Sequence, residues 1–135
     1  MTGKLLLCEY ARITDNGLKF DIIGGGIKTV TIRQFPAPMM FTLLIETNFA
    51  LAETGRAHSF EIKIIDEDGK PAGPPLAGQI HVNQGHNGPT YATVVIQFMV
   101  SKAQKITYSL LVNGNELDST NLEIKAMGVA GKPHT

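Results

Sequence analysis

Three histidines are the residues best suited to metal chemistry, namely His58, His81 and His86. Imidazole nitrogens bind zinc or iron, and a sandwich-type metalloenzyme would place such ligands on adjacent strands. Two ligands on one strand need a spacing of two residues to point to the same face. His81 and His86 are five residues apart across turn-forming residues, and His81 alternates with the apolar Ile80 and Val82. We therefore predict no metal here, and a metal-dependent enzyme using these histidines is an alternative.

Two further motifs have a chemical and a structural interpretation. The run Asp66-Glu67-Asp68-Gly69 resembles the start of a calcium loop, but the distal bidentate glutamate of such a loop is absent. Asp and Gly at these positions are also typical of an ordinary turn, which we predict. The run Gly24-Gly25-Gly26 would cradle a phosphate only if a helix followed it. The β-branched residues at 27–32 predict a strand instead, so we expect a flexible turn or bulge.

Nucleophilic catalysis has no support in the sequence. The single cysteine, Cys8, lies in an apolar run that predicts a buried thiol without the nearby cation that would activate it. The serines occur without a Gly-x-Ser-x-Gly motif. We expect no catalytic residues, no cofactor and no enzymatic activity.

Composition excludes other classes of partner. Twelve basic residues balance twelve acidic ones, and no basic run is present, so we expect neither nucleic-acid nor membrane-surface binding. A net charge of zero removes a repulsion that opposes self-association. The short apolar stretch near the N-terminus does not resemble a signal peptide, and one cysteine allows no internal disulfide. These features predict a cytoplasmic protein.

Alternation with a period of two residues dominates the chain and predicts half-buried strands. Asp15-Asn16-Gly17 and Asn113-Gly114-Asn115 predict tight hairpins, residues 83–89 an exposed loop, and residues 49–57 a short helical turn. We expect an all-β, two-sheet antiparallel sandwich as a single domain over residues 1–128, with a flexible tail over 129–135. The predicted strands cover 4–13, 18–23, 27–33, 39–47, 58–65, 76–82, 90–100, 105–112 and 117–126.

The alternation also divides the strands into two faces. The residues expected to share one core are Phe60, Ile62, Ile64, Val94, Ile96, Phe98, Tyr108 and Leu110. On the strand at 90–100, this assignment places Tyr91, Val95 and Met99 on the outer face. Such an apolar stripe indicates either a covering layer within the fold or a protein interface.

Short motifs along the chain resemble a family of small bacterial proteins of unknown function. Those of the first half are Leu7–Arg12, Gly17-Leu18, Ile22-Ile23-Gly24 and Phe35-Pro36. Those of the second half are a strand entering Asp66–Gly69 and a hairpin at Tyr108–Gly114. The resemblance spans about Leu5 to Ala126 and implies an immunoglobulin-like or related β-sandwich in a bacterial cytoplasmic protein, without catalytic residues. The Gly24–Gly26 run and the 83–89 loop depart from the family pattern.

These observations favour a non-enzymatic protein-interaction or self-assembly module. Tyr91, Val95 and Met99 are its candidate interaction residues, and the partner is another protein or a second copy of the chain. The alternatives are a small-ligand or carbohydrate-binding module and the metal-dependent enzyme. Carbohydrate binding usually relies on aromatic stacking, yet the chain has no tryptophan and its three tyrosines are scattered.

Overall fold

The computed structural model describes residues 1–14 and 19–127, which form strands joined by short loops. A single 3-10 turn, Leu51–Glu53, interrupts the strands in this part of the chain, where a short helical turn was predicted. The nine strands are β1 Thr2–Thr14, β2 Lys19–Gly25, β3 Thr29–Ile32, β4 Ala37–Asn48, β5 Arg56–Ile65, β6 Leu76–Val82, β7 Pro89–Val100, β8 Gln104–Val112 and β9 Asn115–Ala126.

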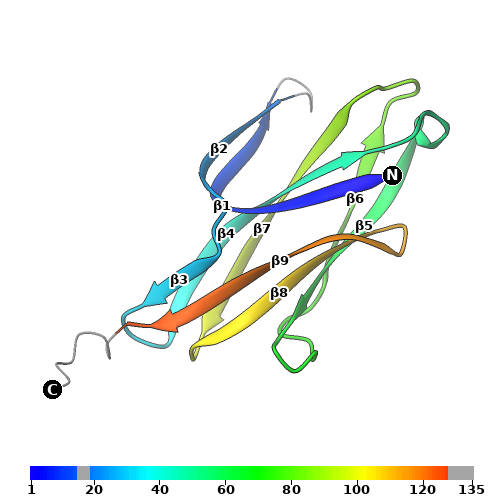
Figure 1. Cartoon of the computed structure of the whole chain (residues 1–135). Helices are drawn as coiled ribbons and strands as arrows, with labels where there is room; N and C mark the ends of the chain where they lie inside the picture. The colour runs from blue at the N-terminus through cyan, green and yellow to red at the C-terminus, as the bar shows by residue number, and fades with distance from the viewer. Residues whose placement is uncertain (15–18, 128–135) are drawn as a thin grey trace, which may run out of the picture.

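The strands pack as two sheets, which confirms the predicted all-β sandwich (Figure 1). One sheet has the order β2-β1-β4-β7 and the other the order β3-β9-β8-β5-β6. All pairs of neighbouring strands are antiparallel except β3 and β9, which run parallel. This parallel pair departs from a purely antiparallel sandwich, because β3 joins the second sheet beside a strand far away in sequence. An immunoglobulin-like topology stays a prediction of the family resemblance.

Turn chemistry places the strand boundaries close to those predicted. Asn113 and Gly114 have φ values of 53° and 85°, which are the left-handed conformations that a two-residue hairpin requires. Residues 83–88 form the mostly exposed connection between β6 and β7, close to the predicted loop at 83–89. The predicted Asp15-Asn16-Gly17 turn and the predicted tail at 129–135 lie outside the described residues.

All eight residues predicted to share one core belong to the same cluster between the sheets. Five of them are buried, whereas Ile64, Val94 and Phe98 are half-buried and pack against the others. Other members of this cluster come from the inner faces of β1, β4, β6 and β9, including Leu7, Leu43, Ile45, Ile80, Leu122 and Ile124. Alternation in the sequence therefore predicted correctly which face of β5, β7 and β8 is covered.

Strand β1 contributes to two different packing layers. Its first half pairs with β4, and its second half pairs only with β2, so β1 changes direction midway along its length (Figure 1). Gly24, opposite this bend, has φ 61°, and a Cβ there would lie 2.6 Å from the Glu9 side chain. Only glycine fits this position without strain.

The bent β1–β2 hairpin packs against the outer face of the first sheet and forms a second, smaller cluster. Cys8, Ala11 and Leu44 are its buried members. The half-buried side chains around them are Leu6, Ile13, Phe20, Ile22 and Tyr91. This cluster was not predicted, because no alternation pattern indicates that a hairpin folds over the sheet to which it belongs.

Candidate functional site

His58 is a buried structural residue in β5. Its Nε2 donates a hydrogen bond to the backbone carbonyl of Glu53 at 2.7 Å, and its Nδ1 accepts one from Nδ2 of Asn113 at 2.9 Å. The imidazole ring also stacks on Phe49, with a centroid distance of 4.2 Å. A metal needs a free nitrogen lone pair, and both ring nitrogens of His58 are already engaged.

The other two histidines do not converge on His58. His58 lies opposite Ile80 in the β5–β6 ladder, so His81 next to it points to the other face and is exposed. His86 lies in the loop before β7, where its Nε2 is 3.2 Å from the carbonyl oxygen of Pro89. No cluster of three metal-ligating side chains occurs within residues 1–14 and 19–127.

The acidic run after β5 forms the predicted turn. Oδ1 of Asp66 accepts hydrogen bonds from the backbone N–H groups of Asp68 and Lys70, both at 2.9 Å. Gly69 has φ 79°, the conformation that favours glycine in turns. In the other glycine-rich run, Gly24 and Gly26 have positive φ values and lead into strand β3 rather than a helix. Both motifs therefore have a structural role.

Cys8 is fully buried in the smaller cluster. Burial raises the pKa of its thiol, and a backbone hydrogen bond offsets part of this effect. A raised pKa disfavours the thiolate, which is the reactive form. The predicted structural role of this cysteine agrees with its environment.

The predicted outer stripe of β7 is divided by the β1–β2 hairpin. Tyr91 is half-buried, since the ring of Phe20 packs against it with a centroid distance of 4.7 Å. Val95 and Met99 are 57% and 64% exposed. The neighbouring strand adds Met40, which is 61% exposed and lies opposite Gln97, diagonally between these two residues. We call Met40, Val95 and Met99 the outer patch.

Strand β7 is also an edge strand, since it pairs only with β4. Among the described residues, the backbone groups of β7 from Tyr91 onward have no hydrogen-bond partner beyond β4. The first half of β1 also has an open edge, but its backbone groups there have hydrogen-bond partners. The Leu5 N–H donates to Oδ2 of Asp118 at 2.7 Å, and the Leu7 carbonyl accepts from the N–H groups of Gly26 and Ile27.

The other edge strands carry features that oppose pairing with a further strand, and β7 carries almost none of them. β3 has 4 residues, β2 contains Lys19 and Asp21, and β6 contains Gly78 and His81 over 7 residues. β7 has 12 residues, no charged residue, and a single proline at its first position. Long uncharged edges are templates for further strand pairing.

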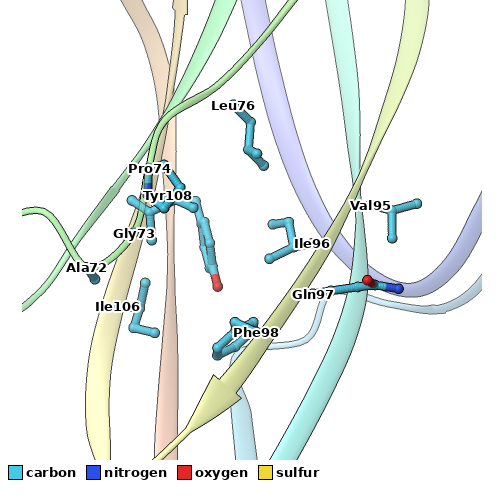
Figure 2. A pocket seen from close by; sticks show the side chains of 11 residues that line it. Ala72, Gly73, Pro74, Leu76, Val95, Ile96, Gln97, Phe98, Ile106 and Tyr108 are labelled. Atoms are coloured by element: carbon cyan, nitrogen blue, oxygen red, sulfur yellow. The ribbon is translucent and has the colours of Figure 1, made fainter.

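A cavity of about 500 Å³ lies directly behind this edge, between the two sheets (Figure 2). The Val95–Phe98 segment of β7 forms one wall, and the β5–β6 connection and β8 form the others. Figure 2 shows the Tyr108 ring entering the cavity, whereas the Val95 side chain points away from it. The lining residues are Ile64, Ala72, Gly73, Pro74, Leu76, Val95, Ile96, Gln97, Phe98, Ile106 and Tyr108.

Sequence reasoning missed part of this region. Met40 lies two residues before Thr42 and six before Glu46, and these polar residues on the same face are the signal that could have placed it outward. The cavity could not, since Ile64, Phe98 and Tyr108 were correctly assigned to the core, and only their three-dimensional spacing leaves room between them.

Comparisons with known proteins identify a family without assigning an activity. No curated protein and no solved structure gives a significant match. No helix long and apolar enough to span a membrane is found in the described part of the chain. Residues 4–125 match a family described as a family of unknown function (DUF6941), as the motifs in both halves of the sequence suggested. The chain therefore belongs to the DUF6941 family.

Proposed function

We propose that this protein is a non-enzymatic self-assembly module, in which two copies pair through their β7 edges. The observation that carries the proposal is the 12-residue, charge-free edge of β7 next to the exposed outer patch. Antiparallel pairing of two β7 strands satisfies the open backbone groups of both copies and extends the four-stranded sheet to a continuous sheet across the dimer.

The residues on the outer face of β7 are suited to cross-strand pairing with the same residues of a second copy. They occupy positions 91, 93, 95, 97 and 99, so Val95 is the central one. In a two-fold arrangement Val95 meets Val95 of the second copy, and Tyr91 lies opposite the second copy's Met99. Both cross-strand pairs are apolar, and cross-strand pairs of this kind stabilise sheets. The zero net charge adds no long-range repulsion between the copies.

Backbone pairing and apolar burial are both needed in this dimer. Burying a large apolar side chain gains about 1.5–3 kcal/mol, whereas association costs about 4–15 kcal/mol. The outer patch alone therefore gives at most a marginal dimer. Hydrogen bonds along β7 supply the additional stabilisation. Each open N–H or C=O group exchanges a bond to water for a bond to the partner strand, which gives a modest net gain.

The absence of an activity is also part of the proposal. Both nitrogens of His58 are hydrogen-bonded and the thiol of Cys8 is buried, so neither residue offers a reactive group. Among the described aromatic residues only Tyr10 is largely exposed, which gives little basis for stacking a carbohydrate. The lone buried cysteine also supports a cytoplasmic location.

Light scattering of the wild type and two lysine variants tests the proposal. Val95→Lys places two ammonium groups opposite each other on the two-fold axis, so we expect a monomer. Ile23→Lys is the matched control, because Ile23 is 60% exposed on β2 at the far edge of the same sheet. We expect this control to remain a dimer. A monomeric wild type, or equal masses for all three proteins, would contradict the proposal.

Amide hydrogen exchange provides a second readout that is specific to strand pairing. The N–H groups of Tyr91–Val100 that point away from β4 should gain protection from exchange as the protein concentration rises. The N–H groups of β6, another edge strand, should show no change in protection. Dimerisation without added protection in β7 would place the interface elsewhere.

A further inference from the structure

The cavity behind β7 has the size and lining of a small-molecule site. Its volume of about 500 Å³ lies within the range of known ligand pockets, which is roughly 300–1,000 Å³. Its walls are mostly aliphatic and aromatic side chains, and no charged residue lines it. The cavity is not fully enclosed, so a ligand can enter without separating the two sheets.

One polar group in this cavity lacks a partner. The side chain of Tyr108 is 1% exposed, and Figure 2 shows its hydroxyl directed into the cavity near Phe98. No hydrogen bond joins this hydroxyl to any residue of the described chain. In that part of the chain, every fully enclosed side-chain nitrogen or oxygen has a hydrogen-bond partner. The Tyr108 hydroxyl has none, so it is not fully enclosed and is accessible from the cavity. Buried polar groups are normally hydrogen-bonded, and this one is open to a ligand.

We propose that this cavity binds a small, uncharged, mainly apolar molecule whose oxygen acceptor, such as a ketone oxygen, takes a hydrogen bond from the Tyr108 hydroxyl. The lack of charged lining residues excludes a charged ligand, because an unpaired charge is strongly disfavoured in an apolar site. The ligand would lie between the sheets and contact Ile96 and Phe98 of β7 from the inner side.

The state of the tyrosine agrees with a donor role. Desolvation raises the pKa of Tyr108 to about 12, so the hydroxyl keeps its proton at every physiological pH. A protonated phenol donates a hydrogen bond to a neutral carbonyl oxygen, and it does not supply the negative charge that a cationic ligand would need.

Fluorescence titration with prodan, a neutral naphthyl ketone, tests the proposal against the anionic naphthalene dye ANS. We expect saturable prodan binding and much weaker binding of ANS. Tyr108→Phe removes only the hydroxyl and should weaken prodan binding roughly 3- to 10-fold. Gly73→Leu should weaken it further by filling the cavity, since a Cβ at Gly73 would contact only the Ile64 side chain, at 3.8 Å, and clash with nothing.

Two controls separate this site from the outer patch and from loss of folding. Met99→Lys changes the outer patch and does not line the cavity, so prodan binding should be unchanged. Thermal melting of each variant shows whether it is folded at the titration temperature. The proposal is wrong if prodan does not bind, if ANS binds as tightly, or if folded Tyr108→Phe and Gly73→Leu both bind prodan like the wild type. It is also wrong if Met99→Lys abolishes binding. Because Met99→Lys also alters the proposed β7 pairing surface, unchanged prodan binding in this variant separates the ligand site from dimerisation.

Discussion

The ring of Phe20 in β2 packs edge-on against the ring of Tyr91 in β7, with a centroid distance of 4.7 Å and an interplanar angle of 65°. The two residues belong to strands at opposite edges of the same sheet, so the hairpin must reach over β4 to bring them together. This contact covers one end of the apolar stripe on β7 and leaves Val95 and Met99 exposed. It also closes the smaller cluster around Cys8.

Replacing Phe20 by alanine should make Cys8 reactive. Removal of this ring takes away an aromatic pair and part of the apolar contact that holds the hairpin, so local opening becomes easier. We expect the thiol to react with DTNB under native conditions about tenfold faster than in the wild type, corresponding to about 1.4 kcal/mol. Phe20→Leu, which keeps apolar volume, should show a smaller increase. Equal rates in all three proteins would mean that the hairpin does not protect Cys8.

The His58–Asn113 pair should be energetically coupled. Asn113→Gly keeps the left-handed turn but removes the bonds from the Asn113 side chain to His58 and to the Ser59 N–H. We expect it to cost about 1–3 kcal/mol, because a buried imidazole nitrogen loses its partner. Urea denaturation of the two single variants and the double variant, with His58→Ala as the second change, measures the coupling. A coupling energy below about 0.5 kcal/mol would show that the interaction between the two side chains does not contribute to the free energy of unfolding.

Tyr108 should make folding stability fall at alkaline pH. Its pKa is raised to about 12 in the folded protein, above the ordinary value of 10.0, so the folded state holds this proton more tightly than the unfolded state. The resulting stabilisation is complete below about pH 10 and is lost as the pH rises toward 12. We expect a loss of up to about 1.4 kcal/mol per pH unit in that window.

Tyr108→Phe is the control for this pH dependence. Other groups can also change the stability at alkaline pH, so only the difference between wild type and variant reports on Tyr108. Denaturant unfolding at several pH values between 9 and 12 should show a shallower decline for Tyr108→Phe. Parallel curves for the two proteins would contradict a raised pKa at this position.

Truncations in the core should distinguish enclosed positions from those at the cavity. Ile62 is completely buried, so Ile62→Ala should cost about 2–5 kcal/mol. A cost of about 3–5 kcal/mol applies to a fully buried phenylalanine, but Phe98 is half-buried and lines the cavity. Phe98→Ala should therefore cost less than Ile62→Ala in urea denaturation. The reverse order would mean that the cavity is closed in solution.

The strands, the buried faces of β5, β7 and β8, and most of the turns can be predicted from the amino-acid sequence alone. Alternation such as Phe60-Glu61-Ile62 predicts which side of a strand is covered, because successive side chains point to opposite faces of a sheet. Asn113-Gly114 predicts a hairpin through the conformations that these two residues tolerate. Both patterns are local properties of a few neighbouring residues. The spacing of His58, His81 and His86 in the sequence also predicts that these three residues do not form a metal-binding site.

What lies beyond each face and edge of the strands depends on how the whole chain folds. The pattern placed Tyr91, Val95 and Met99 outward, but it did not indicate that Phe20 would cover only the first. It assigned Tyr108 to the core, but it did not indicate that the sheets leave a cavity in front of its hydroxyl. Both outcomes depend on contacts between residues far apart in sequence, such as Phe20 with Tyr91. Alternation reports whether a side chain leaves water, whereas the group that replaces the water is set by how the sheets and hairpin pack together.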